Sequence, residues 1–369
     1  MLVRRGRCMA KIRVGIVYGG RSVEHEVSIA SATSILQALD PSRYDVRLIA
    51  VSKEGRWHLG GPGLLPEAVL EAPEVTLPAV AGARELFDAK SGRPAGALDV
   101  VLPIVHGTGG EDGSLQGFLE LTGIPYVGAG VLGSAIQMDK ELTKRLLAAD
   151  GLPVVPGTCV RAHELARDAG AVAERVLGDL GLPLFVKPAC GGSSVGISKV
   201  KRTEDLVPAL REAARYDGKL LVERAVTARE LEIAVLGNET PEASVPGEIV
   251  PHAEFYDYES KYVDESTELR VPAPVSEETT RRMQEMALRA FGLLEGAGMA
   301  RVDFFFDDRS GQLWINEVNS LPGFTEVSMY PRLWQASGLP YPALLDRLIE
   351  LALEGAQGRQ ALERSYHRG

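Results

Sequence analysis

The sequence predicts a mixed α/β fold of three domains, in which an open, mostly parallel sheet precedes two units with antiparallel strands. Three observations support this prediction. The chain begins with alternating strand-like and helix-like segments, later strands are joined by short turns, and 369 residues are enough for about two or three domains. We expect the domains to span residues 1–129, 130–226 and 227–369.

The pattern of the first domain is typical of a βαβ unit. Residues 11–20 form an apolar run that ends in glycines, 24–39 carry apolar residues at helical spacing, and 44–52 form the next strand. Another apolar strand at 97–107 leads through a glycine-rich stretch into a helix. Residues 60–97 are rich in Gly, Pro and Ala, which predicts loops with a short helix. A ligand site is expected beyond the carboxyl ends of the parallel strands.

The later domains contain antiparallel hairpins. A helix that ends at Gly151 opens the second domain, and a glycine-rich loop joins the buried strand 182–188 to a strand at 197–201. No helix separates these two strands, so we expect an antiparallel pair. In the third domain, the strands 300–306 and 312–319 flank the turn DDRSG.

Composition limits the possible functions. The 50 acidic and 40 basic residues give a net charge of −10, which argues against a nucleic-acid partner or an anionic membrane. The chain has no apolar run long enough to span a bilayer. Its three scattered cysteines include no CxxC pair, so we expect a cytoplasmic protein.

The last hairpin carries the strongest site signal. Side chains alternate along a strand, so Arg301 shares a face with Asp303, and Glu317 shares a face with Asn319. If the strands pair in register, Asp303, Glu317 and Asn319 converge as oxygen ligands suited to Mg²⁺. The alternative is a solvated polar face. We favour a metal site because the neighbouring apolar residues predict burial, and unpaired buried carboxylates are costly.

A second signal is Lys187, which is followed by a glycine loop containing Ser193 and Ser194. Such a loop brings backbone N–H groups close to phosphate oxygens, and the lysine adds a positive charge. The alternative is a tight hairpin turn. The loop is not a Walker A motif, because GxxxxGK[ST] is absent. Lys140, at the start of a helix, fits a phosphate contact and a surface lysine equally well.

Weaker signals come from single residues. A carboxylate such as Glu223 or Glu230 accepts hydrogen bonds from amino or ribose hydroxyl groups, but on local evidence a solvated carboxylate is favoured. Glu24 lies at a helix N-terminus that suits an anion, although it could merely stabilise the helix dipole. His106, beside a glycine-rich loop, is equally compatible with a structural role and a role in the site. Residues 252–266 suit either a loop that covers a site or an ordinary surface loop.

Together these segments resemble the D-alanine-D-alanine ligases of the ATP-grasp superfamily. Eight blocks occur in the family's order between residue 12 and about residue 330: YGGRSVEHEVS, VLPIVHGTGGEDG, MDK, VKPACGGSSVGISKV, VERAV…REL, FYDYESKY, ARVDFFF and NEVNSLPGFTEVS. The resemblance implies an ATP-grasp fold preceded by a Rossmann-like domain with a parallel sheet, with ATP between the second and third domains.

The resemblance also implies roles for individual residues. It assigns the nucleotide to Lys140, Lys187, Ser193, Ser194, Glu223, Val226, Glu230 and Lys261. It assigns two Mg²⁺ ions, replaceable by Mn²⁺, to Asp303, Glu317 and Asn319. Substrate binding falls to Glu24, His106, Gly323 and Ser328, and the catalytic residues would be Glu24, Ser193, Tyr262, Arg301 and Gly323.

The implied reaction joins two D-alanine molecules through a D-alanyl phosphate, releases ADP and phosphate, and serves peptidoglycan precursor synthesis. The partners would be the small molecules D-alanine and ATP and a second copy in a homodimer. The competing functions are D-alanine-D-lactate ligation and another ATP-grasp carboxylate-amine ligation. In the family, Tyr at the position of Tyr262 accompanies D-alanine and Phe accompanies D-lactate, so Tyr262 favours the dipeptide.

Overall fold

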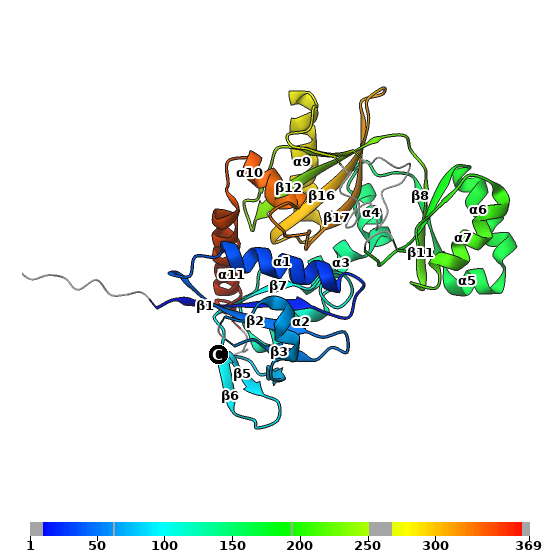
Figure 1. The fold of residues 1–369 in the computed structure, drawn as a ribbon. Coiled ribbons are helices and arrows are strands. Elements are labelled where there is room, and N and C mark those ends of the chain that lie inside the picture. The colour runs from blue at the N-terminus through cyan, green and yellow to red at the C-terminus, as the bar shows by residue number, and fades with distance from the viewer. Residues whose placement is uncertain (1–9, 62, 193–194, 251–267, 364–369) are drawn as a thin grey trace, which may run out of the picture.

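The computed structural model describes residues 10–61, 63–192, 195–250 and 268–363 (Figure 1). Its N-terminal sheet has the strand order β3-β2-β1-β7. Strand β1 runs parallel to β2 and β7, and β3 is antiparallel, which confirms the predicted open, mostly parallel sheet. The elements of this region are β1 Ile12–Gly19, α1 His25–Ala38, β2 Tyr44–Val51, β3 Trp57–Leu59, β7 Val100–Ile104 and α2 Ser114–Thr122.

Residues 60–97 contain more regular structure than we predicted. The predicted short helix is present as a 3-10 helix, but the remainder is not all loop, because three short strands form an antiparallel sheet in the order β4-β5-β6. Strands of two to four residues flanked by Gly and Pro carry too little alternation to be recognised. Leu86, on β5, is fully buried in an apolar cluster that also contains Val75 and Leu98. The elements are η1 Pro66–Glu71, β4 Val75–Thr76, β5 Glu85–Asp88 and β6 Pro94–Ala97.

The central sheet is antiparallel and has the order β10-β9-β11-β8. Pairing of β9 with β10 confirms the predicted hairpin around the glycine loop. Helices α6 and α7 bury their apolar stripes against this sheet. The elements are α3 Val131–Met138, α4 Lys140–Ala149, β8 Gly157–Arg161, α5 Ala162–Arg167, α6 Ala169–Leu180, β9 Leu184–Pro188, β10 Ser198–Val200, η2 Thr203–Asp205, α7 Leu206–Ala213 and β11 Lys219–Arg224.

The large sheet has the order β15-β14-β12-β16-β17, and β13 pairs with β12. Helix α9 packs on this sheet, and Ser276 caps its N-terminus, because the Ser276 hydroxyl accepts a hydrogen bond from the Thr279 backbone N–H at 3.1 Å. The elements are β12 Arg229–Gly237, β13 Glu242–Ala243, β14 Gly247–Val250, β15 Glu268–Arg270, α9 Glu277–Leu293, β16 Gly298–Asp307, β17 Gln312–Asn319, α10 Met329–Ala336 and α11 Tyr341–Gln360.

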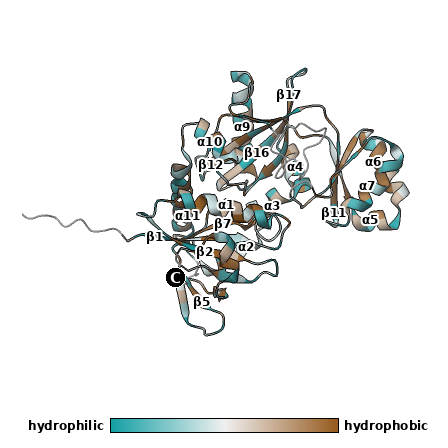
Figure 2. Ribbon diagram, viewed as in Figure 1, coloured by the Kyte–Doolittle hydropathy of each residue, from teal (hydrophilic) through white to brown (hydrophobic). Residues whose placement is uncertain are grey.

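Helix α11, near the end of the chain, packs against both the N-terminal region and the large sheet. Most of its buried residues belong to one apolar cluster, which also includes residues of helix α1, of β1 and β7 of the N-terminal sheet, and of β12 of the large sheet. Figure 1 shows this helix beside the N-terminal sheet, and Figure 2 shows apolar residues concentrated on the strands. The two sheets are therefore held together by a shared core. Within the described ranges, no helix is long and apolar enough to cross a membrane.

Candidate active site

A cavity of about 1180 Å³ lies where the three sheets meet. It is lined by the first turns of α1 and the segment after β7, by β9 and β11 of the central sheet, and by β12, β16 and β17 of the large sheet. It contains every predicted site residue that the structure describes: Glu24, His106, Lys140, Lys187, Glu223, Val226, Glu230, Arg301, Asp303, Glu317, Asn319, Gly323 and Ser328. The predicted residues Ser193, Ser194, Lys261 and Tyr262 lie outside the described residues.

Strands β16 and β17 pair in the register that the sequence predicted. Asp303 lies opposite Glu317 and Arg301 lies opposite Asn319. The Asn319 side-chain amide donates a hydrogen bond to Asp303 Oδ2 at 2.9 Å, so the three predicted ligands converge. The pairing shifts by one residue after Asp303, which makes Asn316 the extra residue of a β-bulge.

These donors fit Mg²⁺ as a partial ligand set. They supply two carboxylates and one amide oxygen, which are the hard ligands that Mg²⁺ takes, and this ion completes its shell with phosphate and water. Among the described residues, no group of three or more His, Cys, Asp or Glu side chains forms a full protein cage. Asn316 Oδ1 is buried beside these ligands and accepts no hydrogen bond from a described residue, so the site offers a further oxygen.

A row of carboxylates crosses three strands at this point. Asp303 has Glu317 on one neighbouring strand and Glu232 on the other. Arg301 offsets their repulsion: it donates to both oxygens of Asp303 at 2.7 Å, and its Nε lies 3.1 Å from Glu232 Oε2. Burial lowers the pKa of Arg301, but the charges of Asp303 and Glu232 outweigh it and raise the pKa well above its usual value. Arg301 is therefore a fixed positive charge in the cavity wall.

Glu223 is buried rather than solvated, which corrects the interpretation that its local sequence favoured. Its side chain is 4% exposed and lies between two lysines. Lys187 Nζ is 2.5 Å from Glu223 Oε2, and Lys144 Nζ donates to Glu223 Oε1. Burial raises the pKa of Glu223, but the charges of both lysines outweigh it and hold the pKa below its usual value. The carboxylate is therefore ionised.

Lys140 joins the glycine loop to the acidic hairpin. It is the first residue of α4, and its Nζ donates to the Gly191 carbonyl at 2.6 Å and lies 3.5 Å from Glu317 Oε2. The side chain is 13% exposed, so it is not the surface lysine of the alternative interpretation. An anion bound between the glycine loop and the acidic hairpin would contact the Lys140 ammonium group.

A sharp turn at the end of β1 positions Glu24. Gly19 has φ 89°, and a Cβ there would lie 2.3 Å from the Val51 carbonyl oxygen, so only glycine fits. Ser28 Oγ accepts a hydrogen bond from the Gly19 N–H at 2.7 Å and donates to the Ile104 carbonyl, which ties α1 to the ends of β1 and β7. Helix α1 then begins directly after Glu24.

Glu24 is buried, with 8% of its surface exposed, and its carboxylate lies between two glycine-rich segments. A Cβ at Gly107, after β7, would lie 2.7 Å from Glu24 Oε2, and a Cβ at Gly192, in the loop after β9, would lie 2.5 Å from the same atom. Glu24 makes no side-chain cap hydrogen bond at the N-terminus of α1, and it lines the cavity.

His106 is buried at the end of β7 and is held on both ring nitrogens. Its Nδ1 lies 3.4 Å from Glu111 Oε1, and its Nε2 is 3.3 Å from Ser31 Oγ. Burial lowers the pKa of His106, but the hydrogen bond and charge of Glu111, together with the charge of Glu24, outweigh it and raise the pKa. The imidazole lines the cavity close to Glu24.

The segment after β17 closes the cavity. Gly323 and Ser328 both line it, and Ser328 begins helix α10. Ser328 Oγ accepts a hydrogen bond from the Thr325 backbone N–H at 3.1 Å and pairs with the Thr325 hydroxyl at 2.7 Å. These bonds hold a turn whose polar groups face the cavity.

Sequence reasoning missed Lys144, Glu232 and Asn316. Lys144 follows Lys140 by four residues on one helix, which places both on the same side of α4 and is a readable signal. Glu232 follows Glu230 by two residues on a strand and shares its face. Asn316 gave no signal, because a β-bulge cannot be read from residue types.

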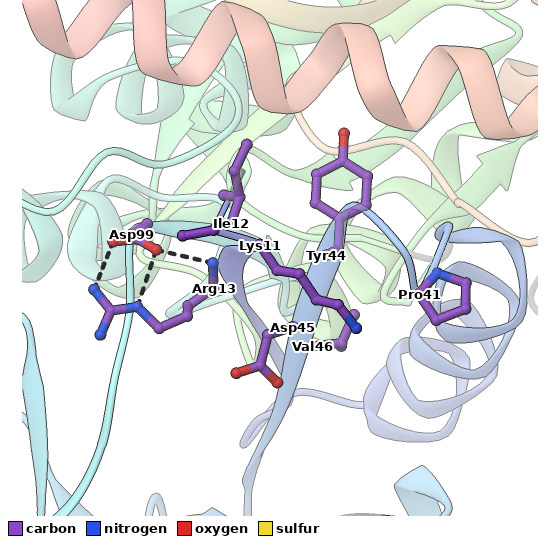
Figure 3. A pocket seen from close by; sticks show the side chains of 9 residues that line it. Lys11, Ile12, Arg13, Pro41, Tyr44, Asp45, Val46 and Asp99 are labelled. Atoms are coloured by element: carbon purple, nitrogen blue, oxygen red, sulfur yellow. Dashed lines mark hydrogen bonds and ion pairs between the residues drawn. The ribbon is translucent and has the colours of Figure 1, made fainter. Parts of the chain in front are cut away.

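A second cavity, of about 860 Å³, lies at the opposite end of the parallel strands (Figure 3). There Arg13 binds Asp99 through its backbone N–H at 2.9 Å and its guanidinium at 3.0 and 2.7 Å. None of the predicted site residues in the described ranges lines this cavity. The ion pair between Arg13 and Asp99 joins β1 to the residue directly before β7.

Family models match both halves of the chain. The model described as "D-ala D-ala ligase N-terminus" matches residues 13–129, and "D-ala D-ala ligase C-terminus" matches residues 146–350. The chain is 52% identical to D-alanine–D-alanine ligase A of Chromobacterium violaceum, across 97% of this chain and 99% of that protein. It is 46% identical to the D-alanine–D-alanine ligase of Oceanobacillus iheyensis, across 97% of this chain and 100% of the relative.

Solved structures of ligases also match this chain over nearly its whole length. The D-alanine-D-alanine ligase from Coxiella burnetii superposes with a TM-score of 0.85 at 40% identity and covers 95% of this chain and 96% of its own. A D-Ala:D-Ser ligase from Enterococcus faecalis gives a TM-score of 0.84 at 31% identity, covering 93% of this chain and 100% of its own. The fold, the cavity and these relatives lead to one assignment: the chain belongs to the D-alanine-D-alanine ligase family of the ATP-grasp superfamily.

Proposed function

We propose that this protein joins two D-alanine molecules at the expense of ATP and so supplies D-alanyl-D-alanine for peptidoglycan. One observation carries the proposal: a single cavity holds Glu24 and His106 opposite Lys187, Arg301 and the acidic hairpin. Glu24, a carboxylate suited to an amino-acid ammonium group, therefore shares the cavity with groups suited to a nucleoside triphosphate and its metal. The family's names support the choice of D-alanine over D-lactate as the second substrate.

The reaction needs activation of a carboxylate, because oxide is a very poor leaving group. Transfer of the γ-phosphoryl group of ATP to the first D-alanine gives D-alanyl phosphate and ADP. The amine of the second D-alanine then attacks the acyl carbon, phosphate leaves, and the amine loses a proton to give the dipeptide. Both steps require the substrates to be held in line, which is a matter of position and charge.

The first D-alanine would be held by the N-terminal region. Glu24 would bind its ammonium, because the carboxylate is desolvated and points into the cavity. His106, held by Glu111 and Ser31, would line the same pocket. Fixing the ammonium relative to Arg301 would select the D-enantiomer.

The nucleotide would lie between the central and large sheets. Lys140 and Lys187 would contact phosphates, with Ser193 and Ser194 of the glycine loop covering them. Glu223 and the backbone at Val226 would bind adenine, Glu230 would bind the ribose, and Lys261 would add a further contact. Lys140, Lys187, Glu223 and Glu230 all line the cavity, which supports this placement.

Asp303, Glu317 and Asn319 would hold two Mg²⁺, or Mn²⁺ in their place. When bound, the metal would neutralise charge on the transferred phosphoryl group. Arg301, which donates to Asp303 beside the Asn319 amide, would supply a positive charge at the edge of this metal site. Its guanidinium and the Gly323 amide would stabilise the oxyanion of the tetrahedral intermediate. Ser328 would help to bind the carboxylate of the second D-alanine.

Trapping the acyl phosphate tests this course. With ATP, Mg²⁺, D-alanine and hydroxylamine, the protein should form D-alanine hydroxamate, and Glu24→Gln should abolish it while ADP still binds. Hydroxamate formation that is equally fast with L-alanine would contradict the role of Glu24. Tyr262→Phe should raise the ratio of D-lactate ester to dipeptide, whereas Tyr258→Phe, in the same segment, should not. An unchanged ratio in Tyr262→Phe would contradict the role of Tyr262.

The proposal includes a homodimer in the cytoplasm. The cysteine usage supports a reducing compartment. Light scattering of the purified protein tests the assembly: a mass of twice 39.6 kDa is expected, and a mass of 39.6 kDa would contradict the dimer.

A further inference from the structure

Glu223 is shared between two lysines that come from different elements. Lys187 lies on β9 and meets Oε2, whereas Lys144 lies on α4 and meets Oε1. The side chains are 10% and 6% exposed, so both contacts are out of water. One carboxylate and two ammonium groups leave one positive charge in excess in this buried cluster.

The two lysines differ in their access to the cavity. Lys187 and Glu223 line it, but Lys144 is not among the described residues that do so. Lys144 therefore contacts Glu223 from behind, on the side away from the space that a ligand would fill. An anion in the cavity can draw Lys187 toward itself, and Lys144 has no such path.

We propose that Lys144 is a positioning residue for nucleotide binding: it stays on Oε1 of Glu223 and holds that carboxylate ionised and in place while Lys187 leaves Oε2 for the nucleotide phosphates. This inference rests on the proposed function, in which Lys187 meets phosphate and Glu223 accepts from adenine. Lys144 itself touches neither substrate.

Charge balance is the physical reason. If Glu223 had only Lys187 as a partner, movement of Lys187 to a phosphate would leave a buried carboxylate without a counter-ion, which is strongly unfavourable. With Lys144 in place, the carboxylate keeps one full ion pair, and the excess positive charge becomes available to the phosphates. Burial and the charge of Lys187 lower the pKa of Lys144 to about 8, so Lys144 still carries its proton at pH 7.

The test is a comparison of ADP affinity in two backgrounds. Lys144→Met keeps the length of the side chain and removes its charge. It should raise the Kd for ADP, measured by calorimetry without D-alanine, by about 10- to 100-fold, the usual range for a charged hydrogen bond. In a Glu223→Gln background, Lys144→Met should raise the Kd for ADP by about threefold or less, because no buried carboxylate then requires a positive partner. The KM for D-alanine should stay within about twofold, which separates positioning from general damage.

Arg145→Met is the matched control, because Arg145 is the next residue of the same helix and its side chain is 67% exposed. It should leave the Kd for ADP unchanged. Lys144→Arg keeps the charge and should retain most of the affinity. If Lys144→Met does not fold, Lys144→Gln replaces it, with an expected rise in Kd of about fivefold or more.

Two results would overturn the inference. One is a folded Lys144→Met or Lys144→Gln protein with ADP affinity equal to that of the parent. The other is a loss of ADP affinity on Lys144→Met that is equally large in the parent protein and in the Glu223→Gln background. Failure of the proposed function would look different, since the parent protein would then not bind ADP, or Lys187→Met and Glu223→Gln would leave its affinity unchanged.

Discussion

The glycine loop and Glu24 are in such close contact that one methyl group should disturb the site. A Cβ at position 192 would lie 2.5 Å from Glu24 Oε2, 3.1 Å from Cδ and 3.2 Å from Oε1. Non-bonded carbon and oxygen atoms need roughly 3.4 Å or more, so Gly192→Ala would displace the carboxylate by about 1 Å. Only the end of a flexible side chain has to move, so the protein should fold normally.

The functional cost follows from that displacement. A misplacement of about 1 Å in a substrate-positioning group costs about 100-fold in rate. We expect Gly192→Ala to lower kcat/KM for D-alanine by about that factor, with a thermal midpoint close to that of the parent. The Kd for ADP should change by less than about threefold, because the proposed function assigns Glu24 to the amino acid and not to the nucleotide.

Steady-state ADP release with D-alanine as the varied substrate measures the effect. Gly191→Ala is the control in the same loop, because the nearest atom to a Cβ there is Pro188 Cβ at 3.6 Å, an ordinary contact. It should retain kcat/KM within about threefold. An equal loss of activity in the two variants would contradict the role of the Gly192–Glu24 contact, and so would a Gly192→Ala protein in which ADP binding weakened as much as kcat/KM fell.

Three further perturbations follow from the structure. Glu317→Gln should raise the Mg²⁺ concentration for half-maximal activity by about 10- to 100-fold, and an unchanged Mg²⁺ titration would remove Glu317 from the metal site. Asp99→Asn breaks the pair with Arg13, whose hydrogen bond lowers the pKa of Asp99, so it should cost about 1 kcal/mol in urea unfolding above about pH 4. That difference should vanish as the pH falls through the lowered pKa, and a pH-independent difference would contradict the ion-pair explanation. Phe291→Ala should cost about 3–5 kcal/mol of unfolding free energy, because Phe291 is 1% exposed under the large sheet, and a cost below about 1 kcal/mol would contradict this placement.

Strand alternation made the acidic hairpin predictable. The period of two is set by the backbone, so Asp303, Glu317 and Asn319 could be placed on one face before their pairing was known. The turn DDRSG fixed the register, and the structure confirms the pairing of Asp303 with Glu317. Order along the chain likewise identified the parallel strands of the first region, because apolar runs alternated with a helical pattern.

The buried charges could not be predicted in the same way. Glu223 has a polar neighbour in sequence and looks solvated, but its partner Lys144 is 79 residues away and meets it only after folding. Glu232 belongs to the site only because it pairs with Asp303 on the neighbouring strand β16. The small sheet within 60–97 was missed because its strands are too short for a period to emerge. Local patterns report local structure, and these features depend on tertiary contacts.

The most direct test of the account is product analysis with purified protein, ATP and Mg²⁺. ADP release and mass spectrometry should be compared for D-alanine, for L-alanine, and for D-alanine with D-lactate. We expect D-alanyl-D-alanine as the product with D-alanine, whether or not D-lactate is present, release of one ADP and one phosphate per dipeptide, and no turnover with L-alanine. ATP binding without turnover on D-alanine, or an ester as the main product, would contradict the account.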